Sequence, residues 1–261
     1  MNGPTSYARI RVADGSVLTA DYSPDGTLNA AGRVYRAEEI QYLPPASPTK
    51  LVCVGLNYRA HADEMAESLP DEPLLFFKPP SALAAFGEPI VRPVGVTSRL
   101  DYEGELVVVM ARRTTRVSEA SALEYVEGLT IGNDVTARQF QVPGSQWTRA
   151  KGYDTFAPVG PAIVRTTDWS GRGVETRLNG GLVQSSTTDR MIFGVPTLIS
   201  WISSIMTLEP GDLIFTGTPS GVGPMNDGDV VEVTVEGIGC LRNTVIASEV
   251  LFDKQPVGAP S

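Results

Sequence analysis

The stretch GELVVVMA, residues 104–111, is apolar from its third residue to its end. Such a run is typical of a strand that is buried on both faces. Shorter apolar runs occur at LVCVG (51–55), LLFF (74–77) and LIFT (213–216). Together these runs predict a body that is built mainly from strands.

The residues between these runs predict turns and a few short helices. The chain contains 26 glycines and 20 prolines, which favour tight loops over long helices. The spacing of apolar residues predicts a helix over residues 195–206, with Pro196 in its first turn. Shorter helices are expected over residues 57–69, after Ser118 and directly after Asp134.

Two further patterns support the same fold class. The pair Asn179-Gly180 predicts the turn of a hairpin, since both residues tolerate a positive φ. Residues 230–235 (VVEVTV) alternate between apolar and polar, which is typical of a half-buried strand. We therefore expect a strand-dominated α+β fold that closes as a sandwich or barrel rather than an alternating βαβ fold.

The chain divides into two parts at a proline-rich stretch. Residues 1–48 begin with an alternating strand pattern, YARIRV, and end in LPPAS, which is typical of a linker. We expect residues 1–48 to form a small β module and residues 49–261 to form the main domain. Residues 251–261 are expected to be a frayed tail.

The bulk composition excludes several classes of function. The net charge is −9 and basic residues do not cluster, so nucleic acid is a poor partner. No apolar run is long enough to span a membrane, and the first residues do not resemble a secretory signal. With only two cysteines among 261 residues, the chain is expected to be cytoplasmic with free thiols.

Three acidic residues are candidates for a metal site. Glu103 and Glu105 lie two apart at a strand start, so their side chains leave the same face. Asp134 follows a second apolar run and could add a third oxygen ligand. Such a set favours Mg²⁺, with Mn²⁺ as the alternative. The competing interpretation is two solvated glutamates and an aspartate that caps a helix.

Other polar residues are candidates for catalysis. His61 is the only histidine, and Glu64 lies one helical turn beyond it, as a general base would require, although the spacing alone favours a surface helix on which the two are merely neighbours. Lys151 is expected to be partly buried and to need an anionic partner. The loop GTPSGVG (217–223) contains Thr218, a possible hydroxyl ligand, and otherwise reads as a plain turn.

These segments in order resemble the fumarylacetoacetate hydrolase family. The resemblance rests on six stretches that span roughly residues 50–245: VGLNYRAHADEM, LLFFKPPSAL, LDYEGELVVVMAR, TIGNDVTARQFQ, WTRAKGYDTFAPVGP and LEPGDLIFTGTPSGVGP. It implies a mixed β-roll around a metal site, a homodimer, and a leader module at the N-terminus. Gln139 and Gly152 depart from the family pattern, which usually has Asp and Ser there. We expect these departures to alter an ion pair and to widen the pocket, respectively.

The resemblance also assigns roles to individual residues. It implies that the metal is bound by Glu103, Glu105 and Asp134. The implied catalytic residues are His61, Glu64 and Lys151, with Thr155 beside Lys151. The implied substrate ligands are Arg138, Gln141 and Thr218.

The implied reaction is cleavage of a C–C bond in a small 2-oxo or 2,4-dioxo acid through a metal-stabilised enolate. Acylpyruvate or fumarylpyruvate hydrolysis and oxaloacetate decarboxylation fit because the His-Glu pair is present. The alternative is isomerisation of 2-hydroxyhepta-2,4-diene-1,7-dioate in aromatic catabolism. An alternative of another class is a non-catalytic protein that binds a metal and an oxo acid.

Overall fold

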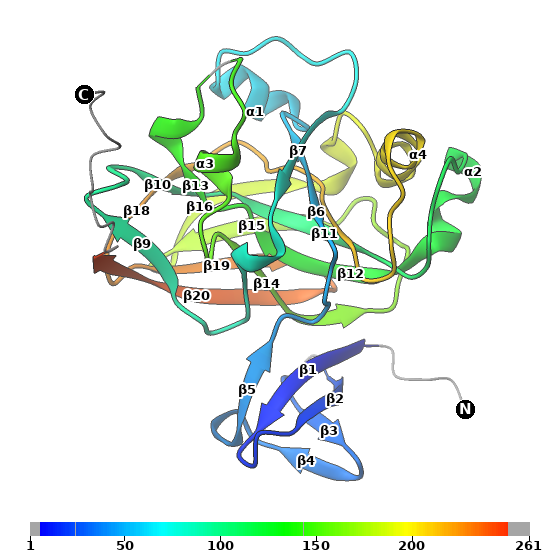
Figure 1. Cartoon of the computed structure of the whole chain (residues 1–261), viewed down its shortest axis with the longest axis vertical. Coiled ribbons are helices and arrows are strands. Elements are labelled where there is room, and N and C mark those ends of the chain that lie inside the picture. The colour runs from blue at the N-terminus through cyan, green and yellow to red at the C-terminus, as the bar shows by residue number, and fades with distance from the viewer. Residues whose placement is uncertain (1–5, 24, 143, 250–261) are drawn as a thin grey trace, which may run out of the picture.

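The computed structural model describes residues 6–23, 25–142 and 144–249 (Figure 1). Strands dominate these residues, and the helices are few and short, as the sequence predicts. The expected frayed tail, residues 251–261, lies outside the described residues. The strands are β1 (Ser6–Val12), β2 (Val17–Tyr22), β3 (Leu28–Ala30), β4 (Arg33–Tyr35), β5 (Ile40–Leu43), β6 (Leu51–Gly55), β7 (Leu74–Lys78), β8 (Leu83–Ala84), β9 (Ile90–Val94), β10 (Leu100–Tyr102), β11 (Gly104–Met110), β12 (Val126–Asn133), β13 (Thr136–Ala137), β14 (Ala157–Val164), β15 (Gly173–Leu178), β16 (Gly181–Thr187), β17 (Leu213–Phe215), β18 (Gly223–Met225), β19 (Val230–Val235) and β20 (Gly239–Glu249).

The largest sheet carries the strands that the apolar runs predict. Its order is β4-β3-β2-β1-β14-β12-β11-β17-β6-β7, and β11 pairs with β12 and β17 on its two sides. Every residue of β11 is buried, which confirms the prediction for residues 104–110. Since a central strand has no free edge, apolar side chains on both faces are what this position requires.

A second sheet, β16-β15-β19-β20-β9, packs against the first. The core between them combines Leu106 and Val108 of β11 with Val174 of β15 and Val233 of β19. The hairpin β15–β16 turns at Asn179 and Gly180, both with positive φ, as predicted. The expected sandwich-like closure is therefore confirmed, and a third small sheet, β13-β10-β18, covers one end.

The N-terminal strands continue the main sheet rather than standing apart from it. Strand β1 pairs with β14 through Ser6 and Tyr7, while β2 and β5 flank β1. This part has a small apolar core around Ile10 and Leu28. It lies at the opposite end of the molecule from α1 and α3 (Figure 1). Whether residues 1–48 fold by themselves stays a prediction.

The helices are shorter than the sequence suggests. They are α1 (Arg59–Glu64), α2 (Glu119–Ala122), α3 (Thr148–Lys151) and α4 (Val195–Ile205), with short 3₁₀ turns at Ala37–Glu39, Pro80–Ala82, Leu123–Tyr125, Arg138–Phe140 and Thr188–Arg190. Helix α4 matches its prediction, and its apolar face covers the core. Among the described residues, no helix is long and apolar enough to cross a membrane.

The helix expected after Asp134 is wrong. Asp134 is followed by β13 and a single 3₁₀ turn. Thr136 pairs with Asp101 of β10, so the backbone of this segment is used by a sheet ladder and cannot form helical bonds. Asp134 is therefore not a helix cap, and its carboxylate is free for other partners.

Candidate active site

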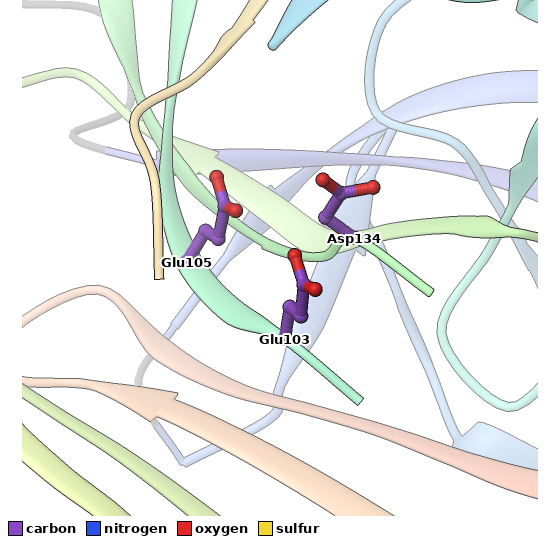
Figure 2. Close-up of side chains that lie close together, drawn as sticks. All are labelled: Glu103, Glu105 and Asp134. Atoms are coloured by element: carbon purple, nitrogen blue, oxygen red, sulfur yellow. The ribbon is translucent and has the colours of Figure 1, made fainter. Parts of the chain in front are cut away.

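Three buried carboxylates converge on one wall of a cavity. The side chains of Glu103, Glu105 and Asp134 bring one oxygen each to within 4.8 Å of one another (Figure 2). All three residues are at most 4% exposed. The cavity that they line has a volume of about 180 Å³.

The strands explain why these side chains meet. Glu103 and Glu105 flank Gly104, so both point to the cavity while Gly104 faces the second sheet. A Cβ added at Gly104 would lie 2.2 Å from Thr176 Oγ1, so only glycine allows this close approach. Gly104 pairs with Asn133, which places Asp134 beside the two glutamates.

Two buried lysines neutralise part of this negative charge. Lys151 Nζ donates to Glu103 Oε2 at 2.8 Å and to Asp134 Oδ2 at 2.6 Å. Lys78 Nζ donates to the other oxygen of Asp134 at 2.5 Å. Burial opposes the charged form of Lys151, but Asp134 and Glu103 outweigh it and raise the pKa of this lysine. Burial lowers the pKa of Lys78 despite Asp134 beside it.

Arg138 closes the network on the side of Glu103. Its Nη2 donates to Glu103 Oε1 at 2.5 Å, its Nε donates to buried Asp101 at 2.8 Å, and its Nη1 donates to Gln141 Oε1. Although burial opposes ionisation, Lys151 and Arg138 lower the pKa of Glu103. The pKa of Arg138 is raised mainly by Glu103, against the effect of its burial.

Glu105 is the carboxylate that lacks a cation. Its Oε2 accepts a hydrogen bond of 2.8 Å from the Gly217 N–H, and it forms no ion pair among the described residues. Burial raises its pKa well above the usual value, and Asp134 and Glu103 raise it further. A buried carboxylate in this position needs a proton or a cation. A divalent cation with oxygen ligands fits this donor set.

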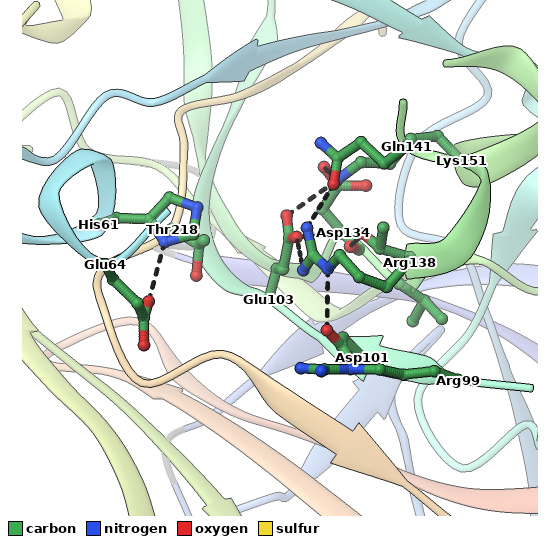
Figure 3. A network of polar contacts seen from close by, with 12 residues as sticks. His61, Glu64, Arg99, Asp101, Glu103, Asp134, Arg138, Gln141, Lys151 and Thr218 are labelled. Atoms are coloured by element: carbon green, nitrogen blue, oxygen red, sulfur yellow. Dashed lines mark hydrogen bonds and ion pairs between the residues drawn. The ribbon is translucent and has the colours of Figure 1, made fainter. Parts of the chain in front are cut away.

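His61 approaches Glu103 from the side opposite Lys151 and Arg138 (Figure 3). Its Nδ1 lies 3.1 Å from Glu64 Oε2, as the spacing in α1 predicts. Glu64 also accepts the Gly221 N–H at 3.0 and 3.2 Å, which ties α1 to the loop 217–223. The Nδ1–H is thus directed to Glu64, which leaves Nε2 as the free ring nitrogen.

The remaining expected residues differ in how close they lie. Gln141 and Thr218 line the cavity, but Thr218 Oγ1 already donates to Gly104 O at 2.9 Å. Arg138 and Gln141 reach the cavity from the start and the end of the 3₁₀ turn, because the helix expected after Asp134 does not form. In the described part of the chain, Thr155 does not line the cavity, and its Oγ1 accepts the Val91 N–H at 2.8 Å.

The two departures from the family pattern act away from the cavity. Gln139 Oε1 accepts the N–H groups of Ser98 and Arg99 at 2.9 and 3.2 Å, so it holds a loop and alters no ion pair at a helix start. A Cβ at Gly152 would lie 2.7 Å from Thr148 O. Glycine there allows the close end of α3 and does not widen the pocket.

Sequence reasoning missed Lys78 and Asp101 as parts of the charge network. Lys78 ends an apolar run, and a lysine at the end of a buried strand is a signal that could have been used. Asp101 is fully buried and binds Arg99 and Arg138. Their links to the site run through partners that are distant in sequence, since Asp134 lies 56 residues beyond Lys78 and Arg138 lies 37 residues beyond Asp101.

Comparison with known proteins identifies the family to which the chain is similar. Residues 50–246 match the family described as Fumarylacetoacetate (FAA) hydrolase C-terminal. The oxaloacetate tautomerase YisK of Bacillus subtilis (strain 168) is 41% identical over 226 residues, which cover 81% of this chain and 75% of that protein.

Solved structures show the same relationship. The 5-carboxymethyl-2-hydroxymuconate delta-isomerase from Mycobacterium smegmatis has a TM-score of 0.85 at 41% identity, covering 94% of this chain and 100% of that one. The fumarylpyruvate hydrolase from Pseudomonas aeruginosa, in complex with Mn²⁺ and pyruvate, has a TM-score of 0.73 at 31% identity, covering 80% and 92%. The match over residues 50–246 and these relatives show that the chain belongs to the fumarylacetoacetate hydrolase family.

Proposed function

We propose that the chain is an enzyme that binds a divalent cation and acts on a small 2-oxo acid through the enolate of that acid. The observation that carries the proposal is the cluster of three buried carboxylates, one without a cation, on the wall of a cavity that also contains His61. Glu103, Glu105 and Asp134 would hold the ion, with Mg²⁺ expected and Mn²⁺ as the alternative. When bound, it supplies Lewis-acid stabilisation of the charge that develops on the 2-oxo oxygen.

The side chains around the three carboxylates would bind and orient the substrate. Lys151 and Arg138 add positive charge beside the carboxylates, so a small anion is attracted to this end of the cavity. Gln141 offers its amide N–H, because its oxygen is already occupied by Arg138. The Thr218 hydroxyl donates to Gly104 O and accepts the Gln184 amide N–H at 2.9 Å, so only its second lone pair would be left to accept from a substrate.

His61 would move the proton at C3 of the substrate. Its Nε2 would take the proton as a base, and Glu64 would stabilise the imidazolium that forms. In the reverse direction, the His61 imidazolium would give a proton to C3 of the enol while the enol O–H proton passes to solvent, which forms the keto acid with no net change in protons. Keto–enol tautomerisation therefore consumes no water and breaks no C–C bond. We favour it for oxaloacetate because the 41% identical relative is named an oxaloacetate tautomerase.

Cleavage of a C–C bond is the second candidate. The His61–Glu64 pair is placed to activate a water for attack on a C4 carbonyl, as hydrolysis of an acylpyruvate or of fumarylpyruvate requires. Decarboxylation of oxaloacetate would pass through the same enolate. Isomerisation of 2-hydroxyhepta-2,4-diene-1,7-dioate is a third use of the same proton transfer, and a solved relative from Mycobacterium marinum bears that name.

Parallel assays with the metal-loaded protein separate these reactions. Enol-oxaloacetate should ketonise faster with the protein than in buffer, as followed by loss of the enol absorbance, while pyruvate and CO₂ form slowly. Formation of pyruvate at a higher rate than ketonisation of enol-oxaloacetate would favour cleavage instead. Binding of Mg²⁺ and oxalate without turnover of oxaloacetate, fumarylpyruvate or the dienol would favour a non-catalytic binding protein.

A cytoplasmic homodimer remains part of the proposal. It rests on the family resemblance, and light scattering of the purified protein tests the dimer directly. A monomer with full activity would remove the dimer from the proposal.

A further inference from the structure

A second cavity adjoins the active-site cavity. The two share four wall residues, which are Leu56, Glu67, Phe76 and Trp147. Beyond these, Leu74 and Leu75 of β7 line the second cavity together with residues 144–146. Because the cavities share a wall, a substrate held at the carboxylates would direct its far end towards this outer cavity.

The outer cavity is lined by large apolar side chains that are not fully buried. Leu56, Phe76 and Trp147 are half-buried, and Leu74 is 39% exposed. The rings of Phe76 and Trp147 pack edge to face with centroids 5.2 Å apart. Gly55 makes room for them, since a Cβ there would lie 3.2 Å from Trp147 Cζ3. Half-exposed apolar side chains around a cavity are typical of a surface that binds a ligand.

The charges differ between the two ends. The inner cavity combines Lys151 and Arg138 with the three carboxylates, whereas no lysine, arginine or histidine of the described residues lines the outer one. Glu67, at the wall that the two cavities share, is the charged residue of the outer cavity. A carboxylate placed there would lack a cationic partner and would face a like charge, so it would be disfavoured.

We propose that the outer cavity is a subsite for an uncharged, apolar tail of the substrate, and that Glu67 selects against a second carboxylate at this end. This inference rests on the proposed function only for the direction in which the substrate is held. It predicts that 2-oxo acids with apolar chains beyond C4 bind well, while long dicarboxylates bind poorly.

A matched pair of ligands tests this proposal by calorimetry on the magnesium-loaded full chain. 2-Oxohexanoate and 2-oxohexanedioate have equal length and differ in the distal carboxylate. 2-Oxohexanoate should bind at least tenfold more tightly than pyruvate, since each buried methylene contributes about fourfold. 2-Oxohexanedioate should gain little over pyruvate. Equal affinity of the two six-carbon acids would overturn the subsite.

Variants locate the effect. Glu67→Gln should raise the affinity for 2-oxohexanedioate about threefold to tenfold and leave 2-oxohexanoate unchanged. Asp71→Asn, on the same loop but outside both cavities, is the matched control and should change neither. Trp147→Ala should lower the affinity for 2-oxohexanoate to that for pyruvate. If both six-carbon acids respond equally to these variants, the proposal is wrong.

Oxalate separates this inference from the proposed function. It is too short to leave the inner cavity, so it reports on the carboxylates alone. Failure of oxalate to bind, with the difference between the six-carbon acids intact, would overturn the proposed function and keep the subsite. Oxalate binding without that difference would do the reverse, and no binding of any acid would overturn both.

Discussion

The two sides of the active-site cavity are held by different means. The carboxylate side consists of Glu105 within β11 and Asp134 directly after β12, in buried sheet structure with buried ion pairs. The opposite side consists of His61 and Glu64 on α1, a helix of six residues. Glu64 is a third exposed, and its bonds to Gly221 anchor the helix.

Because of this difference, we expect the carboxylate side to affect both stability and metal binding, and the helix side to affect activity alone. On the carboxylate side, the groups proposed to bind the metal also satisfy buried lysines, so function and stability are coupled. On the helix side, the proposed base can be changed without leaving a buried charge unpaired. The predictions below test this separation.

The largest effect is expected for Asp134→Asn. The change removes one proposed metal ligand, the anionic partner of Lys78 and one of the two anionic partners of Lys151, which keeps Glu103. Metal affinity should fall at least 100-fold, and stability should fall by about 3–5 kcal/mol because buried Lys78 is left without a counter-charge. Calorimetry with Mg²⁺ and chemical denaturation measure the two losses. If the variant has normal stability, function and stability are not coupled on the carboxylate side, and the proposed difference from the helix side is wrong.

His61→Asn should affect activity alone. The proton transfer should slow about 10²–10⁴-fold, the usual contribution of a positioned general base. Mg²⁺ affinity should stay within about twofold, because His61 is not among the three proposed ligands. Glu64→Gln should give a smaller loss of the same kind. Unchanged turnover by the His61 variant would remove this residue from the mechanism.

Glu105 gives a pH test of the carboxylate side in metal-free protein. Burial, with Asp134 and Glu103 nearby, raises its pKa in the folded state, so protonation favours folding. Its contribution is complete below the unfolded pKa and is lost as pH rises through the folded pKa. Glu105→Gln should remove this loss and raise metal-free stability at pH 8 on the order of 1–3 kcal/mol.

The Mg²⁺ affinity of the Glu105→Gln variant provides a second measurement on the same carboxylate. The same variant should bind Mg²⁺ at least tenfold more weakly, since a carboxamide is a weaker ligand than a carboxylate. Denaturation between pH 5 and pH 8, with and without Mg²⁺, measures both effects. If the variant loses stability in the metal-free state, Glu105 is not the carboxylate that lacks a partner.

The sequence predicts the carboxylates themselves better than the residues and strands that hold them in place. The pairing of Glu103 with Glu105 follows from strand periodicity, which depends on near neighbours only. Lys78 could not be assigned in this way, because its partner Asp134 lies 56 residues further on. The helix expected after Asp134 fails for the same reason, since the competing ladder with β10 is a long-range contact.

Helix α1 shows a second limit of local reasoning. The sequence predicts a helix over residues 57–69, but α1 ends at Glu64 and Ala66 has a positive φ. Met65 and Glu67 then turn to line the cavity. The chain leaves the helix at Ala66, whose positive φ is accompanied by a hydrogen bond from the Glu67 N–H to Ala62 O, and the spacing of apolar residues does not predict this end.

The smallest effect is expected for Thr155→Val, which tests the resemblance-based role beside Lys151. The Thr155 hydroxyl accepts the Val91 N–H, so its loss removes one hydrogen bond at the edge of β9. Stability should fall by about 1 kcal/mol, while Mg²⁺ affinity and turnover stay unchanged. Thr155→Ser keeps the hydroxyl and is the matched control. A fall in Mg²⁺ affinity in the valine variant alone would mean that this hydroxyl supports the carboxylates through Lys151.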